Sequence, residues 1–581
     1  MRTLLRLTRF TQKYWKWLLL AFICLVATTA FSLAVPWMLG EAIDTVINSG
    51  ERSFLVLAAG VVIGASVLRG IAGYGHRYIS EVVSQKTCYD IRDALYNRLQ
   101  RLSFAYHDQA QTGQLMSRAT VDVEAVRMFF GMGLVTLGQT FIMFVGISYI
   151  LASMDWRLAL FSLAFLPAIG WRAIAFSRHL TPIWLKIQQL LGVLGTTLEE
   201  SLIGVRIVKA FSRQNEESQK FSTQATLLYN EQIGVARQMA FNMPLMVFLV
   251  SLPTALILWY GGRQVIAGSL TIGQLTQFAL YLGMLMMPVR RLGFIAGLLS
   301  RTVSAGQRIL EILDTESAVK EKPNAIELSS VKGEVCFEGV SFNYNSLAPA
   351  LKNISFCVKS GESVALVGGL GSGKSTIASL IPRFYDVSSG RITVDGIDIR
   401  DVTLASLRKN VVTAQQDIFL FSSTIRDNIA YGAVDADMEQ IIAVAKAAYL
   451  HDFVQSLPDG YDTWVGERGI TLSGGEKQRL AIARTLLVNP SILILDDSTS
   501  SVDAETEHLM RDSLGKLIKG RTTFIITHRL PIVKNYDLIL VLKDGLIVEQ
   551  GKHSELMSRN GFYRQIYQSQ LSEIRDSGEK S

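Results

Sequence analysis

Charged residues are scarce in this sequence of 581 residues: they make up 18% of the chain, against 49% for the hydrophobic set. Average soluble domains carry about 25% charged residues, so a wholly soluble chain explains the composition poorly. One compact domain is excluded because single hydrophobic cores stop growing near roughly 250 to 300 residues. The same apolar content excludes intrinsic disorder. The composition therefore predicts a membrane part and a soluble part.

Cysteine is rare as well. The four cysteines, Cys24, Cys88, Cys336 and Cys357, are scattered along the chain and show no CxxC or CxxH spacing. This spacing predicts neither a zinc site nor a disulfide scaffold. We expect the four thiols to serve in packing.

Long uncharged runs, in contrast, recur through the first half of the chain. Residues 17–40 hold 24 residues without a charge, and a helix of that length crosses a hydrocarbon core of ~30 Å. Two later runs are short, but they suffice if Arg69 and Arg172 lie near the inner interface, where long side-chain stems snorkel. A short run can also be a buried core helix, yet each one is paired with a full-length neighbour through a short turn. Six membrane spans are predicted, within residues 17–40, 54–68, 128–154, 158–171, 238–262 and 264–289.

Basic residues sort the connections between these spans into two classes. A formal net charge of +7 suggests a nucleic acid or a membrane surface as partner, and the placement of the charges favours the membrane. The N-terminal arm and the two segments after spans two and four together hold 21 basic residues, whereas the three remaining turns hold Arg52, Arg157 and Arg263. By the positive-inside rule, both termini are predicted to face the cytoplasm, and no nucleic-acid partner is expected. A cleaved signal peptide is not expected, because the first apolar run is too long.

The two basic segments keep helical spacing over roughly sixty residues, which is longer than structureless connections usually are. They are predicted to be membrane helices that continue into the cytoplasm. Each contains one interruption by small residues, at Thr112-Gly113 and at Ile203-Gly204. At such a point a helix can end and a short crosswise piece can begin, and this piece can touch a partner domain.

The second half of the chain has a different pattern, of short β-rich runs and helices. Antiparallel strands are predicted within residues 333–344 and 351–359, tight hairpins at Asp395-Gly396 and Asp544-Gly545, and buried parallel strands within residues 363–367, 491–495 and 522–526. An α/β domain with an antiparallel flank is expected. The predicted organisation is an N-terminal arm (1–16), a transmembrane domain (17–305), a linker (306–332), the α/β domain (333–570) and a polar tail (571–581).

Residues 368–375 read Gly-Gly-Leu-Gly-Ser-Gly-Lys-Ser and match the pattern GxxxxGK[ST], between a predicted strand and a predicted helix. Glycines let backbone amides turn toward a phosphate, and the helix N-terminus adds partial positive charge. The lysine can meet the outer phosphates, and Ser375 can reach a magnesium ion. A glycine-rich turn without a ligand is the simpler alternative, but the predicted strand, the lysine and the serine all occupy the positions that the pattern requires. The candidate nucleotide-binding residues here are Gly368, Gly371, Ser372, Gly373, Lys374, Ser375 and Thr376.

Two further motifs accompany this loop. The buried run 491–496 ends in Asp496, whose carboxylate can hold the magnesium, and Asp497 beside it can orient water. Ser473, Gly474 and Gly475 open another helix and offer a hydroxyl and unobstructed amides to an anion. The same residues also fit a plain capping box, because Glu476 follows Ser473 at the required distance. Both interpretations can hold together.

Leu-Ser-Gly-Gly-Glu at residues 472–476 resembles the signature of the ATP-binding cassette superfamily, at that family's distances from both phosphate motifs. The resemblance implies roles for further residues: Tyr344 stacks on adenine, Gln416 is the loop glutamine that reaches the metal and the attacking water, and His528 is the switch histidine. Residues 500–503 resemble the segment that contacts the opposite monomer, and residues 464–469 the sequence that faces the membrane domain. Six spans before the cassette resemble an exporter half-transporter, so the resemblance covers nearly the whole chain.

The resemblance also implies a mechanism. Two cassettes close head to tail around ATP and Mg²⁺, each nucleotide held between one chain's phosphate loop and the other's signature, and closure turns the membrane halves from inward-open to outward-open. One copy of each motif implies that the chain pairs with a second half-transporter in the lipid bilayer of the cell membrane. Residues 117–122 and 204–209 are then the expected couplers to the cassettes, although an ordinary solvated helix face would give the same pattern. The implied activity is ATP-driven export of small amphipathic, lipidic or drug-like substrates.

One residue departs from the family pattern. Asp497 stands where the family usually has glutamate, so its carboxylate is withdrawn by one C–C bond, about 1.5 Å. Because a misplacement of about 1 Å can cost a factor near 10² in rate, hydrolysis at the site built on this phosphate loop should be slow. This resembles one member of heterodimeric exporters, so a heterodimer is favoured. A slow homodimer remains an alternative because Gln416 and His528 are retained.

Other functions remain open at this stage. A nucleotide-gated regulatory or channel-like subunit would need ATP binding but not turnover, and Asp497 leaves room for it. A soluble DNA-repair ATPase shares the signature but would need coiled coils in place of the six spans. Within span six, Arg290 and Arg291 follow a run rich in methionine, so they either face an inner cavity or anchor the helix at the inner interface.

Overall fold

The computed structural model describes residues 2–49, 53–344, 349–414, 418–466, 472–496, 515, 517–527 and 530–569. It divides into two compact units. The first comprises Met1–Gln100 and Gln111–Thr315, and the second comprises Arg101–Ala110 and Glu316–Ser581.

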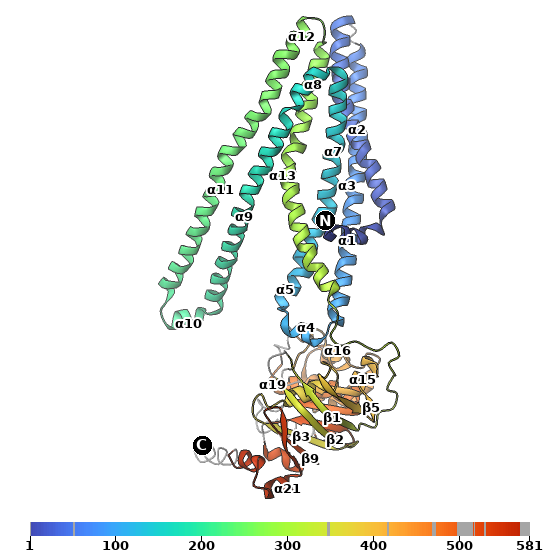
Figure 1. Ribbon diagram of the computed structural model, residues 1–581, viewed down its shortest axis with the longest axis vertical. Helices are drawn as coiled ribbons and strands as arrows, with labels where there is room; N and C mark the ends of the chain where they lie inside the picture. The colour runs from blue at the N-terminus through green and yellow to red at the C-terminus, as the bar shows by residue number, and fades with distance from the viewer. Residues whose placement is uncertain are drawn as a thin grey trace. The chain divides into compact units, whose positions relative to one another are not determined.

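Long helices make up the first unit (Figure 1). Five stretches are long and apolar enough to cross a membrane: Trp15–Ile47, Ser53–Arg101, Thr112–Met154, Trp156–Ile203 and Gln214–Ile266. The sixth predicted span falls largely within α13. The helices are α1 (Arg2–Gln12), α2 (Trp15–Ser49), α3 (Ser53–Arg101), α5 (Thr112–Ser117), α6 (Val123–Met128), α7 (Leu134–Met154), α8 (Trp156–Leu163), α9 (Phe165–Ile203), α10 (Val205–Ala210), α11 (Gln214–Leu256), α12 (Gly262–Ile266) and α13 (Ile272–Asp314), with π-helical turns η1 (Arg118–Asp122), η2 (Phe129–Gly133) and η3 (Ile257–Gly261).

The two short predicted spans are parts of much longer helices. The run 54–68 is the first third of α3, a helix of 49 residues, and the run 158–171 opens a helical stretch that continues through α9 to Ile203. The predicted continuation of the spans beyond the apolar runs is therefore confirmed. The start of span six is corrected from Gln264 to Ile272, because Thr271 caps α13 through a capping box with Gln274.

Helices α9 and α11 run side by side and are joined by α10 (Figure 1). Leu180 and Ile187 of α9 pack against Leu228 and Val235 of α11 along this pair. Toward α10 the side chains are apolar and exposed, including Ile203, Ile207 and Phe211.

Residues 117–122, one of the two segments expected to be couplers, pack against α13 within the first unit. Arg308 of α13 donates to the buried carboxylate of Asp122 through Nε (2.7 Å) and Nη2 (2.5 Å). Arg118 lies 3.3 Å from Glu311 of the same helix. Helix α13 also holds the N-terminal helix, because Arg6 of α1 forms a bidentate pair with Asp314.

Two sheets form the second unit, with strand orders β2-β1-β4-β5 and β10-β9-β3-β8-β7-β6. In the larger sheet β9, β3, β8, β7 and β6 are parallel, whereas β10 pairs antiparallel with β9. The predicted α/β domain with an antiparallel flank is confirmed. The strands are β1 (Val335–Phe342), β2 (Leu351–Val358), β3 (Ser363–Gly368), β4 (Ser389–Val394), β5 (Ile397–Asp398), β6 (Val411–Ala414), β7 (Ile492–Asp496), β8 (Thr522–Ile526), β9 (Leu538–Lys543) and β10 (Leu546–Gly551).

Helices of this unit cover the larger sheet and link its strands. They are α4 (Phe104–Gln109), α14 (Lys374–Leu380), α15 (Leu404–Asn410), α16 (Ile425–Ala430), α17 (Met438–Ala447), α18 (His451–Ser456), α19 (Gly474–Val488) and α21 (His553–Ser558), with 3-10 turns η4 (Gly460–Asp462) and η6 (Leu530–Asn535). Both predicted hairpins are present, and Asp395, Gly396, Asp544 and Gly545 all adopt the positive φ that tight hairpin turns require. Helix α13 continues to Asp314, so the segment assigned to the linker begins as helix.

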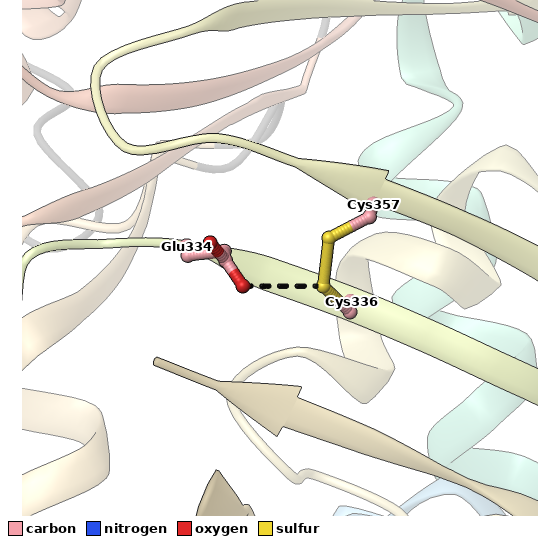
Figure 2. Close-up of side chains that lie close together, drawn as sticks. All are labelled: Glu334, Cys336 and Cys357. Carbon is pink, nitrogen blue, oxygen red and sulfur yellow. Dashed lines mark hydrogen bonds between the residues drawn. A yellow bond between two sulfur atoms is a disulfide. The ribbon is translucent and has the colours of Figure 1, made fainter. Parts of the chain in front are cut away.

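The expectation that all four cysteines are unpaired packing residues is wrong for two of them. Cys336 and Cys357 form a disulfide between β1 and β2 (Figure 2). They lie 21 residues apart in the chain, but the antiparallel register places them directly opposite each other. Spacing rules detect neighbours in sequence and miss a pair that only strand register brings together.

Candidate nucleotide-binding site

The phosphate loop begins where β3 ends. Strand β3 is buried along its length, as expected for a central parallel strand, and α14 begins at Lys374. Between them Gly373 has φ +105°, and a Cβ there would lie 2.6 Å from Leu351 Cδ2 and 3.1 Å from the Ala350 carbonyl oxygen. A Cβ on Gly368 would lie 2.3 Å from the carbonyl oxygen of Leu542. Both positions therefore require glycine, for conformation and for space.

Polar groups in this loop point inward and fit a phosphate. Lys374 is buried, and its Nζ donates to the carbonyl oxygens of Gly368 and Gly369, both at 2.8 Å. The hydroxyl of Ser372 is buried without a hydrogen-bond partner among the described residues, which is costly unless a ligand supplies one. Ser375 is exposed at the start of α14, and Thr376 is buried behind it. A buried cation, an orphaned hydroxyl and a helix N-terminus are the groups that an anionic phosphate needs.

Asp496 lies at the same edge of the sheet. The parallel register aligns Leu366 of β3 with Ile526 of β8 and Ile526 with Asp496 of β7, so the carboxylate ends its strand level with the phosphate loop. Two strand spacings separate β3 from β7, or about 10 Å. This is the carboxyl edge of an open α/β sheet, where ligands bind. Ser375 and Asp496 are the residues that would hold a metal ion at this edge.

Tyr344 follows β1 and is half exposed. Its ring packs edge-on against Phe342 (4.8 Å between ring centroids) and Tyr385 (5.2 Å), and its hydroxyl donates to Thr376 Oγ1 at 3.3 Å. The structure thus brings the aromatic predicted to meet adenine next to the helix that follows the phosphate loop.

The signature residues Ser473, Gly474 and Gly475 open α19. Ser473 forms a capping box with Glu476: its backbone N–H donates to Glu476 Oε2 at 2.7 Å, and its hydroxyl accepts from the Glu476 N–H. The simpler interpretation of this motif is therefore confirmed, and it leaves the amides of Gly474 and Gly475 at the helix N-terminus. Asp497, Gln416, His528, residues 500–503 and residues 467–469 lie outside the described residues.

Comparisons with known proteins agree with this geometry. The family model "ABC transporter transmembrane region" matches residues 18–289, and the model "ABC transporter" matches residues 351–500. The uncharacterized ABC transporter ATP-binding protein YknU of Bacillus subtilis is 38% identical over 99% of this chain and 98% of its own length. The ATP-dependent lipid A-core flippase of Syntrophus aciditrophicus is 36% identical, with coverages of 95% and 92%. A solved bacterial Atm1-family ABC exporter with ATP bound superposes with a TM-score of 0.81 at 31% identity, covering 96% of this chain and 98% of that one.

The chain belongs to the ABC transporter family. It is a multi-pass membrane protein that carries one exporter-type membrane domain and one ATP-binding cassette, and it drives export with ATP. Exporters of this family work as dimers, so this chain is one half of the transporter.

Within the cassette unit, the ABC exporter has a contact that the sequence analysis missed. Helix α4 packs on the segment after α14: the ring of Phe104 stacks on Phe384 (4.3 Å between centroids), and the Tyr385 hydroxyl donates to the Asp108 carboxylate. Burial and this hydrogen bond raise the pKa of Tyr385, so the phenol keeps its proton at physiological pH. This contact lies just before the predicted turning point at Thr112-Gly113. The apolar Phe-Ala-Tyr start of α4, in an otherwise polar stretch, was the available signal.

The membrane unit contains two cavities that combine apolar and cationic side chains. One of about 420 Å³ lies among α2, α3, α7 and α13 and is lined by Arg69, Gln139, Met143 and Met284, among others. The other, of about 920 Å³, lies between α9 and α13. Arg178 and Arg301 line it, and neither has an ion pair within the described residues. Met284 lines the first of these cavities, whereas the side chains of Arg290 and Arg291, for which two placements were expected, lie outside the described residues.

Proposed function

We propose that this chain is the degenerate-site half of a heterodimeric ABC exporter that moves amphipathic molecules with an anionic head group out of the cytoplasmic leaflet. The observation that carries the proposal is that two cavities of the membrane unit have apolar walls and contain arginines, Arg69, Arg178 and Arg301, that form no ion pair within the described part of the chain. Guanidinium groups suit phosphate or carboxylate head groups, and methionine adapts to varied chains. The lipid A-core flippase relatives support a lipidic substrate.

The nucleotide roles are proposed from the family resemblance, and the geometry of residues 368–376 supports those of the phosphate loop. Gly368, Gly371, Ser372, Gly373 and Lys374 cradle the phosphates, Tyr344 stacks on the base, and Ser375, Gln416 and Asp496 hold Mg²⁺. Bound Mg²⁺ would neutralise charge on the phosphates. Asp497 and His528 orient water at this site, weakly because Asp497 is short, and Ser473, Gly474 and Gly475 complete the partner's site. The domain limits proposed from the sequence are kept, except that α13 extends to Asp314 and residues 101–110 belong to the second unit, and both termini and the cassette are in the cytoplasm of the cell.

Two features support a dimer with a second half-transporter. The chain has one phosphate loop and one signature, which serve two different nucleotides in a head-to-tail pair. The exposed apolar side chains near α10, namely Leu202, Ile203, Ile207 and Phe211, supply a surface for a partner. The second chain's cassette is the partner that this surface fits.

The test of the substrate class is the double substitution Arg178→Gln and Arg301→Gln. Each arginine can give a charge-assisted hydrogen bond worth about 1.5 to 3 kcal/mol, so the anionic lipid concentration that half-stimulates ATPase activity of the reconstituted dimer should rise at least about tenfold. Arg263→Gln in an outer turn is the matched control and should leave that concentration unchanged. If anionic and zwitterionic lipids stimulate the ATPase activity of both variants equally, the proposed substrate class is contradicted. A dimer that binds ATP without any turnover under every lipid would instead favour the regulatory subunit.

Phe104→Ala tests the coupling contact of α4. Loss of the stack on Phe384 removes about 0.5 to 1.5 kcal/mol of interaction free energy between the two rings. Transport per ATP hydrolysed should therefore fall several-fold while ATP binding is retained. Transport and hydrolysis are measured side by side in proteoliposomes, with Gln109→Ala at the exposed end of α4 as control. Parallel loss of ATP binding and transport would show that Phe104 only stabilises the cassette.

A further inference from the structure

Two sulfur atoms lie on the outer face of the four-stranded sheet (Figure 2). Cys336 of β1 and Cys357 of β2 are register partners, with their Cα atoms 4.1 Å apart. Their neighbours Val335 and Phe337 are buried in the cassette core, and successive side chains of a strand alternate between faces. Cys336 is half-buried and Cys357 is exposed, so a small molecule in solution can reach the pair.

The reducing conditions of the cytoplasm determine how this cysteine pair behaves. Cytoplasmic thiols are kept reduced, and disulfides that do form there are usually transient, catalytic or redox-sensing. We propose that Cys336 and Cys357 form a reversible thiol–disulfide exchange site that responds to the oxidation state of low-molecular-weight thiols such as glutathione. The inference rests on the cytoplasmic placement of the cassette in the proposed function, and it is independent of substrate and partner.

A neighbouring carboxylate and the exposure of each sulfur set the order of reaction. A carboxylate oxygen of Glu334 lies 3.6 Å from the Cys336 sulfur, and this carboxylate favours the protonated thiol when the pair is reduced. Cys357 is exposed, so its sulfur is the one that a thiol reagent in solution reaches first. The exposed Cys357 is therefore the attacking thiol, and Cys336 is the resolving thiol.

Oxidation proceeds by two exchanges. The Cys357 thiolate attacks one sulfur of glutathione disulfide, forms a mixed disulfide and releases one glutathione thiolate. Cys336 then loses its proton to Glu334 or water, attacks the Cys357 sulfur and releases the second glutathione thiolate. The chain loses two electrons and two protons, and glutathione disulfide becomes two glutathione molecules. Excess reduced glutathione reverses both steps.

Oxidation ties together the strands that support the phosphate loop. Strand β2 is outermost in its sheet, and its first residue, Leu351, packs against Gly373. A cross-link that closes a loop of this length restricts the unfolded chain, so the oxidised cassette should unfold at a temperature higher by roughly 5 to 10 °C.

Alkylation and mass spectrometry test the proposal on the full-length protein. The chain is equilibrated in buffers of reduced and oxidised glutathione, quenched with an alkylating reagent and digested, so that the peptides of Cys336 and Cys357 are read separately from those of Cys24 and Cys88. Both thiols should be alkylated in reduced glutathione and protected in oxidised glutathione, reversibly. In Cys336→Ser, Cys357 should acquire one glutathione, whereas in Cys357→Ser the remaining Cys336 should react at least about tenfold more slowly.

Three outcomes would overturn the proposal. A bond that persists in excess reduced glutathione would make the pair a permanent cross-link, and thiols that stay alkylatable in oxidised glutathione would make them packing residues. One Zn²⁺ per chain that keeps both thiols reduced would make Glu334, Cys336 and Cys357 a metal site instead. These measurements need no nucleotide, so their outcome can be told apart from a failure of the transport proposal.

Discussion

Replacement of Asp497 by glutamate is expected to raise the rate of ATP hydrolysis at the site built on this chain's phosphate loop by about 10². The longer side chain restores the reach of about 1.5 Å that aspartate lacks, and with it the position of the group that orients the attacking water. The substitution keeps the charge, so nucleotide affinity should change little. Single-turnover hydrolysis by the purified dimer, with the partner's catalytic residue disabled, isolates this site.

Asp497→Asn is the matched control, because it has the same length as aspartate and no charge. It should hydrolyse no faster than the unmodified chain. If the chain alone forms a dimer with brisk turnover that Asp497→Glu leaves unchanged, the site is not degenerate and the heterodimer hypothesis fails.

Replacement of Lys374 by alanine should abolish ATP-driven transport. Lys374 is buried, and its ammonium already lies inside the loop, 2.8 Å from two backbone carbonyl oxygens. It can move from these carbonyls to a phosphate at little cost, and charge-assisted hydrogen bonds to phosphate are worth about 1.5 to 3 kcal/mol each. We therefore expect the Kd for ATP to rise by about 10² or more, as measured by nucleotide titration of the detergent-solubilised dimer.

Lys446→Ala at the exposed end of α17 is the control for the loss of one lysine from the cassette and should bind ATP normally. Lys374→Arg keeps the charge but adds bulk in a buried position, and it should restore little binding. ATP affinity within twofold of the unmodified chain in Lys374→Ala would contradict the assignment of residues 368–375 as the phosphate loop.

Much of this molecule could be predicted from local patterns. Uncharged runs long enough to cross a bilayer located the membrane helices, and the buried runs ending at Gly368 and Asp496 located the parallel strands, because period and polarity are properties of neighbouring residues. The ends of helices could be predicted less accurately. Gln264 continues an apolar run, so only the Thr271 cap shows that α13 begins at Ile272.

Contacts between segments distant in sequence could not be predicted in the same way. The Phe104–Phe384 stack joins residues 280 positions apart, and the Asp122–Arg308 pair joins two helices of the membrane unit. The Cys336–Cys357 disulfide depends on strand register. In each case the residue types were visible in the sequence, but the partner is fixed only by tertiary packing.

The most direct test of whether nucleotide drives the membrane domain uses proteoliposomes that contain this chain and its partner half-transporter. It measures the movement of a fluorescent anionic lipid analogue across the membrane. The account predicts that the analogue changes leaflet only when ATP and Mg²⁺ are supplied on the cassette side, and that Lys374→Ala on this chain stops it. Movement at the same rate without nucleotide, or with Lys374→Ala, would contradict it.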